Sequence, residues 1–253
     1  GSAMIGGILR QGIFSKDEII VSNLTDEGRA RSEKTLGVVT TLDNNEVVRS
    51  AKTIVLAVKP QFYEEVLDEV HNSLTADHTI IGIAPGKTLA WLAEKFGKEV
   101  KIVRTMPNTP ALVGEGMTAM CPNEYMEKEE IEYVKQLLES FGRVEVVPER
   151  LMDVVVSVSG SSPAYVFMMI EAMADAAVSG GMPRAQAYQF AAQAVYGSAK
   201  MVLETGKHPG ELKDMVCSPA GTTIEGVRIL EKNGFRSAVF EALQGAADKG
   251  KKM

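Results

Sequence analysis

The stretch that decides the fold is Thr53-Ile54-Val55-Leu56-Ala57-Val58, followed directly by Lys59 and Pro60. A run of this kind, apolar without alternation and ended by a turn, predicts a parallel β-strand covered on both faces. The carboxyl ends of parallel strands are where open α/β sheets bind their ligands. Lys59 therefore places a cation at a candidate ligand-binding edge.

Short β-rich runs alternate with helical patterns around this strand as far as about residue 147. The alternation predicts an α/β domain with a Rossmann-type, mostly parallel sheet and helices on both sides. The other β-rich runs are Glu18–Ser22, Val38–Thr41, Thr79–Ile83, Lys101–Met106, Gly116–Met120 and Arg143–Val147, and the helical patterns include Phe62–Ser73, Leu89–Phe96 and Glu127–Ser140.

The sequence becomes helical throughout after Pro148, so we predict two domains, residues 1–149 and residues 150–253. Ala164–Val178 and Arg184–Val202 are rich in Ala, Met and Tyr with few charges, which indicates burial in a core or against a partner subunit. The predicted helices are Leu151–Ser159, Ala164–Val178, Arg184–Thr205, Gly210–Val216, Ile224–Lys232 and Ser237–Lys249, separated by Gly and Pro.

The chain begins with Gly1-Ser2-Ala3-Met4, which resembles the helix of a dinucleotide-binding turn without the preceding strand. Gly1 would be the third glycine of that turn, and Gly1 and Ser2 are candidate cofactor contacts. We expect that the chain is truncated and that its first strand is missing from this sequence, because a complete parallel sheet without its central first strand would leave the adjoining strands unpaired. The alternative is that Gly1-Ser2 is a remnant of a tag and Met4 the true start.

Composition limits the class of protein. The 253 residues are 45% hydrophobic and 24% charged, an ordinary globular mixture, and the net charge of −6 argues against nucleic-acid and anionic-membrane partners. No apolar run approaches the roughly 20 residues of a membrane span. Two cysteines, Cys121 and Cys217, make no disulfide framework, which favours the cytoplasm, and with three scattered histidines they predict no metal site.

The end of the second β-rich run bears on the cofactor. Ser22 and Asn23 stand where NAD-binding sheets usually carry an Asp or Glu that accepts from the ribose 2′-hydroxyl. Neutral side chains tolerate a 2′-phosphate better, so NADPH is favoured, with NADH possible. The same residues, with Thr25, equally suit the cap of the next helix.

Three loops follow strands on the same predicted edge: Ala57-Val58-Lys59-Pro60, Ala84-Pro85-Gly86 and the loop around Asn108, Met106-Pro107-Asn108-Thr109-Pro110. Each alone reads as ordinary turn chemistry. Three in succession favour a nucleotide site.

These loops, the segment Ser159-Gly160-Ser161-Ser162-Pro163-Ala164-Tyr165 and above all Pro209–Glu231 resemble the pyrroline-5-carboxylate reductase family. The resemblance covers essentially the whole chain. It implies a Rossmann-type cofactor domain, a helical C-terminal dimerisation domain, a homodimer and often a ring of dimers. The implied activity is reduction of 1-pyrroline-5-carboxylate to L-proline by NADPH or NADH, the last step of proline biosynthesis.

Carried over by position, the resemblance implies that Thr223 lies closest to the imine nitrogen and acts catalytically. It assigns substrate contacts to Glu149, Val216, Thr222 and Thr223, and cofactor contacts to Ser22, Asn44, Val58, Lys59, Ala84 and Pro85. One departure is Ala220, where many relatives have glycine, at the expected cost of one methyl group.

The residues themselves support a substrate loop. Ser218 to Thr223 is a run of small residues, with Gly221 at its centre, leading into a helix expected to begin near Ile224. A helix N-terminus offers free N–H groups and a partial positive charge to a substrate carboxylate. We interpret Thr222 as an N-cap and Thr223 as a substrate contact, with Ser218 and Gly221 as further contacts.

Two other functions stay open. A β-hydroxyacid-dehydrogenase-like oxidoreductase shares the two-domain plan but would need a helix-borne lysine facing the nicotinamide, and Gly160–Tyr165 carries none. A non-catalytic NAD(P)-sensing protein would bind the cofactor without turnover. His208 precedes Pro209-Gly210 and reads as a turn residue, not a catalyst.

Overall fold

The computed structural model describes residues 1–97 and 99–251. These form two compact units: Gly1–Gly160 with the C-terminal segment from Ala247 onward, and Ser161–Ala246. The first unit holds the sheet and the second is helical, as the sequence predicts. The predicted boundary at 149/150 falls at the 3-10 turn η4 (Glu149–Leu151), eleven residues before the division between the compact units.

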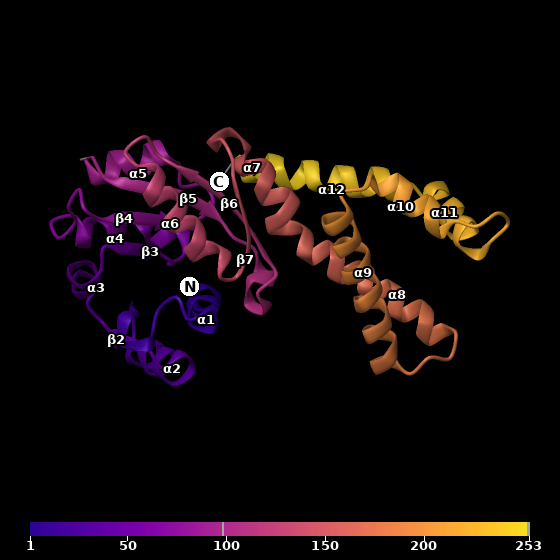
Figure 1. The fold of residues 1–253 in the computed structure, drawn as a ribbon, viewed down its shortest axis with the longest axis horizontal. Coiled ribbons are helices and arrows are strands. Elements are labelled where there is room, and N and C mark those ends of the chain that lie inside the picture. Colours follow the sequence, from indigo (N-terminus) through magenta and orange to yellow (C-terminus); the bar gives the residue numbers. More distant parts are fainter. Residues whose placement is uncertain (98, 252–253) are drawn as a thin grey trace. The chain divides into compact units, whose positions relative to one another are not determined.

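The first unit contains a five-stranded and a two-stranded sheet (Figure 1). All neighbouring strands are parallel except β5 and β6, so the predicted mostly parallel arrangement is confirmed. The larger sheet has the order β3 (Thr53–Leu56), β4 (Thr79–Gly82), β5 (Lys101–Met106), β6 (Gly116–Pro122) and β7 (Gly142–Val146), and the smaller one pairs β1 (Ile20–Ser22) with β2 (Val39–Thr41).

Helices cover both faces of the larger sheet. Because neighbouring side chains of a strand point to opposite faces, Ile80 of β4 packs with Leu67 of α4, whereas Ile81 packs with Met4 of α1 and Leu138 of α6. The α-helices of this unit are α1 (Ser2–Arg10), α2 (Asp26–Leu36), α3 (Asn44–Ser50), α4 (Tyr63–Val70), α5 (Leu89–Phe96), α6 (Lys128–Glu139) and α7 (Met152–Val155), and further 3-10 turns are η1 (Lys16–Glu18), η2 (Pro60–Phe62) and η3 (Thr109–Val113).

The two sheets are not joined by strand pairing. Among the described residues, β1 pairs only with β2, and β3 only with β4, so each of these two strands leaves one edge without a ladder. This open edge corrects one prediction. Val55 of β3 is 38% exposed instead of covered on both faces, because it borders the space between β1 and β3.

The contact between β6 and β7 depends on the absence of a side chain at Gly142. Gly142 pairs with Gly116 and has φ +153°, and a Cβ there would lie 2.0 Å from the Gly116 carbonyl oxygen. Gly142→Ala is expected to lower the free energy of unfolding by more than about 4 kcal/mol, because two backbones would have to separate. Chemical denaturation measures this. Gly6→Ala, where only the end of the Arg10 side chain must move, is the control, and equal losses would contradict the account.

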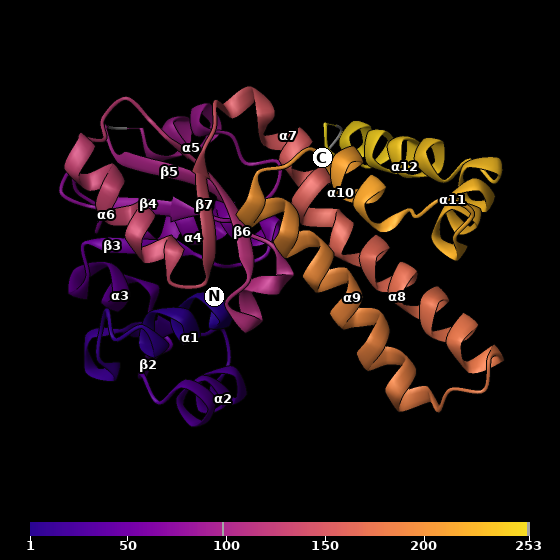
Figure 2. The ribbon, with the colours of Figure 1, turned by 45° about the vertical axis from the view of Figure 1, so that its right-hand side comes forward.

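The helical unit begins inside a continuous helical stretch. α7 passes through the π-helical segment η5 (Val156–Ser161) into α8 (Ser162–Ser179), so the predicted helix end at Gly160 is wrong. A π-turn accommodates an extra residue without ending the helix. α8 and α9 (Arg184–Thr205) then lie side by side (Figure 2), followed by α10 (Pro209–Val216), α11 (Thr222–Lys232) and α12 (Phe235–Gly250).

This unit has almost no core of its own. Its buried hydrophobic residues are Ala174, Ala187 and Ala191, whereas Phe167 and Phe190 are more than half exposed. Of the two sequence interpretations, burial in a core within one chain is therefore wrong for α8 and α9. A surface this apolar needs a cover that the single chain does not supply.

The joining of α7, η5 and α8 also corrects the prediction about apolar length. Among the described residues, the helical stretch Glu149–Ser179 is long and apolar enough to cross a membrane by length and composition alone. Because the sequence predicts a helix end at Gly160, the full length of this stretch could not be predicted from the sequence. The core helix of a soluble protein passes the same test.

Candidate cofactor and substrate sites

A cavity of about 390 Å³ lies between β1 and β3 in the first unit. Its volume is within the range of small-molecule pockets. Of the predicted cofactor contacts, the structure places six on its wall: Gly1, Ser2, Ser22, Asn23, Ala57 and Val58. The structure thus brings together predicted residues from α1, the end of β1 and the end of β3.

The N-terminus of α1 comes close to the end of β3. A Cβ on Gly1 would lie 3.2 Å from the Cβ of Ala57, which is tighter than ordinary packing. Close helix–strand approach is the role of the third glycine in a dinucleotide-binding turn. The N-terminus of α1 also offers unpaired backbone N–H groups suited to a phosphate. The residues present therefore fit the pyrophosphate of a dinucleotide.

At the end of β1, the polar side chains take two different roles. Thr25 caps α2, since its hydroxyl accepts from the Gly28 N–H at 3.1 Å, which confirms the capping interpretation for this residue. Asn23 Oδ1 accepts from the Ser32 hydroxyl at 3.0 Å, while its Nδ2 is buried without a partner. Ser22 caps no helix. These side chains present no carboxylate to a ribose at this position.

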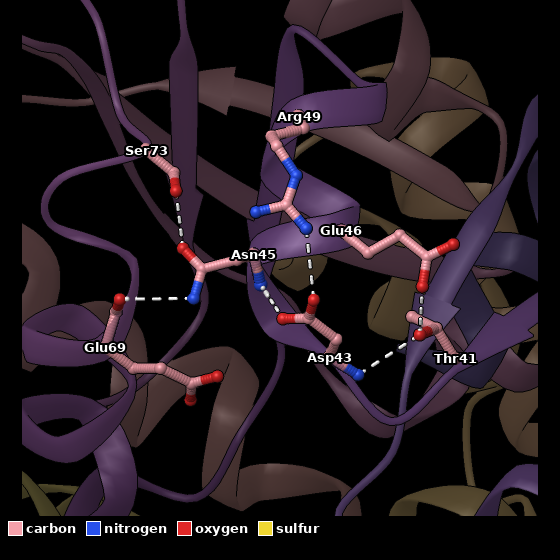
Figure 3. Close-up of polar contacts among 7 residues, drawn as sticks. All are labelled: Thr41, Asp43, Asn45, Glu46, Arg49, Glu69 and Ser73. Atoms are coloured by element: carbon pink, nitrogen blue, oxygen red, sulfur yellow. Dashed lines mark hydrogen bonds and ion pairs between the residues drawn. The ribbon is translucent and has the colours of Figure 1, made fainter.

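Asn44 begins α3, separated by two residues from the end of β2, and a polar network fixes the turn between these elements (Figure 3). The Asp43 carboxylate accepts from the Asn45 N–H at 2.8 Å and from Arg49 at 3.1 Å. The Asn45 side chain donates to the Glu69 carbonyl oxygen, which ties α3 to α4. Asn44 itself donates to the Glu69 carboxylate at 2.7 Å and does not line the cavity.

The loops after β3 and β4 lie at the same edge of the sheet, because these strands are parallel neighbours. Lys59 is exposed at the start of η2, with Pro60 as the first residue of that turn. Ala84 is buried and Pro85 is partly exposed. The structure thus brings the two predicted loops together, beside the cavity wall formed by Ala57 and Val58.

The side chains of Asn108 and Glu149 are engaged in holding the backbone. Asn108 Nδ2 donates to the Ser159 carbonyl oxygen at 3.0 Å, and its Oδ1 accepts from the Met117 N–H at 2.9 Å. Glu149 Oε1 accepts from the Leu89 N–H at 2.7 Å and from Arg104 at 2.9 Å. Through these contacts Asn108 connects its loop to η5 and β6, and Glu149 connects η4 to α5 and β5.

Arg104 was not a sequence candidate, although a charged residue inside the apolar run Lys101–Met106 is a usable signal. It is 4% exposed and pairs with Glu149, while its Nε is buried without a partner. A buried cation needs such a pair. Beside it, burial raises the pKa of the Cys121 thiol, with a further contribution from the Glu149 carboxylate.

In the helical unit, the predicted substrate residues other than Glu149 gather at one loop. Val216 ends α10, Ser218 and Gly221 form the turn, and α11 begins at Thr222, two residues earlier than predicted. Thr222 and Thr223 are exposed, and neither hydroxyl bonds to another described residue. The capping interpretation of Thr222 is wrong, because Gly221 occupies the N-cap position in an extended conformation.

A side chain at position 221 would crowd the turn. A Cβ there would lie 2.4 Å from the Ser218 hydroxyl oxygen and 3.1 Å from the Ser218 carbonyl oxygen. The Gly221 N–H donates to that carbonyl oxygen at 3.0 Å, which closes the turn. The free N–H groups of α11 and two unengaged hydroxyls are thereby presented together to solvent.

Ala220 costs more than one methyl group. It has φ +58°, the only positive φ at a non-glycine residue in the described part of the chain. Ala220→Gly is expected to raise the free energy of unfolding by about 0.5–1 kcal/mol, since glycine adopts this conformation without strain. Chemical denaturation measures this, with Ala238→Gly inside α12 as a control that lowers stability. A loss of stability in Ala220→Gly would contradict the assignment of strain.

His208 is confirmed as a turn residue. It is the N-cap of α10, and its Nδ1 accepts from the Gly210 N–H at 3.0 Å.

Mostly parallel strands with a cavity of about 390 Å³ at their ends are an arrangement found in the class of dinucleotide-dependent oxidoreductases. Comparison with known proteins agrees: residues 1–86 match the family model "NADP oxidoreductase coenzyme F420-dependent", and residues 149–253 match "Pyrroline-5-carboxylate reductase dimerisation". The prephenate dehydrogenase of Aquifex aeolicus, at 16% identity and a TM-score of 0.53, shares the fold alone.

Closer relatives narrow the class. The chain is 51% identical to the pyrroline-5-carboxylate reductase of Escherichia coli over all of this chain and 94% of that protein. The Plasmodium falciparum enzyme, solved with NADP bound, has a TM-score of 0.90 and 34% identity over 100% of this chain and 93% of that one. The structure of the pyrroline-5-carboxylate reductase from Coxiella burnetii has a TM-score of 0.91 and 32% identity over 99% of this chain and 93% of that one. The chain belongs to the pyrroline-5-carboxylate reductase family.

Proposed function

We propose that this protein reduces 1-pyrroline-5-carboxylate to L-proline with NADPH, the last step of proline biosynthesis. Membership of the family supports the substrate. The observation that carries the site is the start of α11, where two exposed hydroxyls without partners stand beside free backbone N–H groups. These groups match a substrate with a carboxylate and a ring nitrogen next to each other.

The substrate carboxylate binds at the N-terminus of α11, where the helix dipole and the free N–H groups favour an anion. Val216, Ser218 and Gly221 shape the pocket around the ring. Thr222 contributes a second donor to the carboxylate.

The Thr223 hydroxyl hydrogen-bonds the ring nitrogen as the imine becomes an amine, and it relays a proton from water to that atom. When bound, the nicotinamide supplies the hydride. The protein therefore acts mainly by orientation, holding the imine carbon against the donor carbon.

The dinucleotide is held at the cavity beside β1 and β3. Gly1 and Ser2 hold the pyrophosphate at the N-terminus of α1, and Ser22 and Asn23 lie on the adenosine side. Ala57, Val58, Lys59 and Pro60 with Ala84, Pro85 and the Asn108 loop border the rest of the cofactor. Ser22 and Asn23 in place of an acidic residue support NADPH over NADH.

The exposed apolar surface of α8 and α9 supports a homodimer that forms through the helical unit. Such dimers would assemble into a ring through a second interface between dimers. The match to a dimerisation model over residues 149–253 supports an oligomer. A biosynthetic reductase with unpaired cysteines Cys121 and Cys217 fits the cytoplasm.

One assay separates the proposed function from its alternatives. NADPH oxidation is followed with 1-pyrroline-5-carboxylate and with no substrate, and NADP⁺ reduction is followed with a series of β-hydroxyacids. Turnover with the cyclic imine alone is expected. Turnover with the hydroxyacids would show a dehydrogenase of the other class, and NADPH binding without turnover would show a sensing protein.

A further inference from the structure

Tyr63, the first residue of α4, carries a buried hydroxyl with three backbone partners. The residue is 1% exposed. Its hydroxyl donates to the Leu56 carbonyl oxygen at 2.7 Å and accepts from the Ile83 and Ala84 N–H groups, both at 3.1 Å. A phenol offers one donor and two acceptor positions, so this hydroxyl is fully used.

These partners lie where two strands separate. Leu56 and Gly82 are the last residues paired between β3 and β4. Beyond them the ladder stops, and the Leu56 carbonyl and the Ile83 and Ala84 amides would be left without strand partners. Because buried backbone groups need partners, the Tyr63 hydroxyl takes the place of the next rung of the ladder.

The two chains that leave this point are the loops assigned to the cofactor. Ala57–Pro60 follows Leu56 directly, and Ala84 and Pro85 begin the other loop. The hydroxyl is therefore bonded to one residue immediately before the first loop and to the first residue of the second. It fixes the separation of the two loops without itself lying on the cavity wall.

We propose that Tyr63 is a positioning residue for the cofactor, acting through the backbone of Leu56 and Ala84 to hold the Ala57–Pro60 and Ala84–Pro85 loops at the separation that NADPH requires. The inference rests on the proposed cofactor site. Burial raises the pKa of the phenol to about 12, so the hydroxyl remains protonated and keeps its donor bond throughout the range in which the enzyme is assayed.

The first test needs no variant. Amide hydrogen exchange of the unaltered protein is measured in the absence of cofactor. Ile83 and Ala84 lie just outside β4, yet their amides are expected to exchange as slowly as those inside the strand, because the hydroxyl binds them. Fast exchange at both positions would overturn the proposal.

The second test uses Tyr63→Phe, which removes the hydroxyl and keeps the ring in its core. We expect the KM for NADPH to rise by about tenfold. This is the change in affinity that corresponds to the net contribution of about one or two hydrogen bonds to the backbone. The kcat at saturating NADPH and the KM for 1-pyrroline-5-carboxylate should change less than twofold. Amide exchange of Ile83 and Ala84 should become faster in the same variant.

The matched control is Phe96→Leu, in the same core cluster as Tyr63 but without a bond to either loop. It lowers stability while the hydroxyl remains, so its KM for NADPH should not change. An equal rise in both variants, or an unchanged KM in Tyr63→Phe, would overturn the positioning role. Failure of the proposed function is separate, because the unaltered protein would then show no turnover at all.

Discussion

Thr223→Val is expected to reduce kcat for 1-pyrroline-5-carboxylate by about 10- to 100-fold and to leave NADPH affinity unchanged. The substitution keeps the shape of the side chain and removes one hydrogen bond to a nitrogen that gains charge during the reaction. Such bonds contribute about 1.5–3 kcal/mol, which corresponds to this change in rate. In the structure the hydroxyl is exposed and bonded to no described residue, so the helix should not be disturbed.

Steady-state kinetics and a direct NADPH titration measure the two quantities. Thr223→Ser, which keeps the hydroxyl, is the matched control and should retain activity within about threefold. If the valine variant turned over at the rate of the unaltered protein, Thr223 would have no part in proton delivery or in orienting the imine.

Ser22→Asp is expected to reverse the choice of cofactor. A carboxylate at the end of β1 accepts from a ribose 2′-hydroxyl but repels a 2′-phosphate. At a separation of about 4 Å near a protein surface, the repulsion between unit charges is up to about 4 kcal/mol before screening. We therefore expect kcat/KM for NADPH to fall on the order of 100-fold while that for NADH changes only a few-fold.

Ser22→Asn is the neutral counterpart and should keep the original preference. Parallel kinetics with both cofactors give the ratio directly. Equal losses for NADPH and NADH in the aspartate variant would mean that the 2′-phosphate does not lie near Ser22.

The strands and helices of the first unit could be predicted from the sequence because their signals are local. The runs Lys101–Met106 and Leu89–Phe96 carry their own apolar patterns, and the structure reproduces both ranges. The loops that follow the strands could be placed on one edge, since parallel topology requires it. Elements whose conformation depends on contacts with residues far away in the sequence could not be predicted in this way. An example is the π-turn through which the helix continues past Gly160.

Parts of the site lay beyond sequence reasoning for the same reason. The Tyr63 hydroxyl binds residues that follow it by 20 and 21 positions, and its place in an ordinary amphipathic pattern predicts only a core residue. The positive φ of Ala220 and the capping role of Gly221 depend on how the turn closes, which the residue types Ser, Thr and Gly leave open. Glu149 was a candidate, but its bonds to Leu89 and Arg104 were not foreseen.

The most direct test of the central claim, hydride transfer to a cyclic imine, follows the hydride itself. The protein is supplied with 1-pyrroline-5-carboxylate and NADPH deuterated at the transferring carbon, and the product is analysed by mass spectrometry and NMR. We predict L-proline carrying one deuterium on Cδ, the ring carbon that was the imine carbon of the substrate. Consumption of NADPH without labelled proline, or no consumption beyond the substrate-free rate, would contradict it.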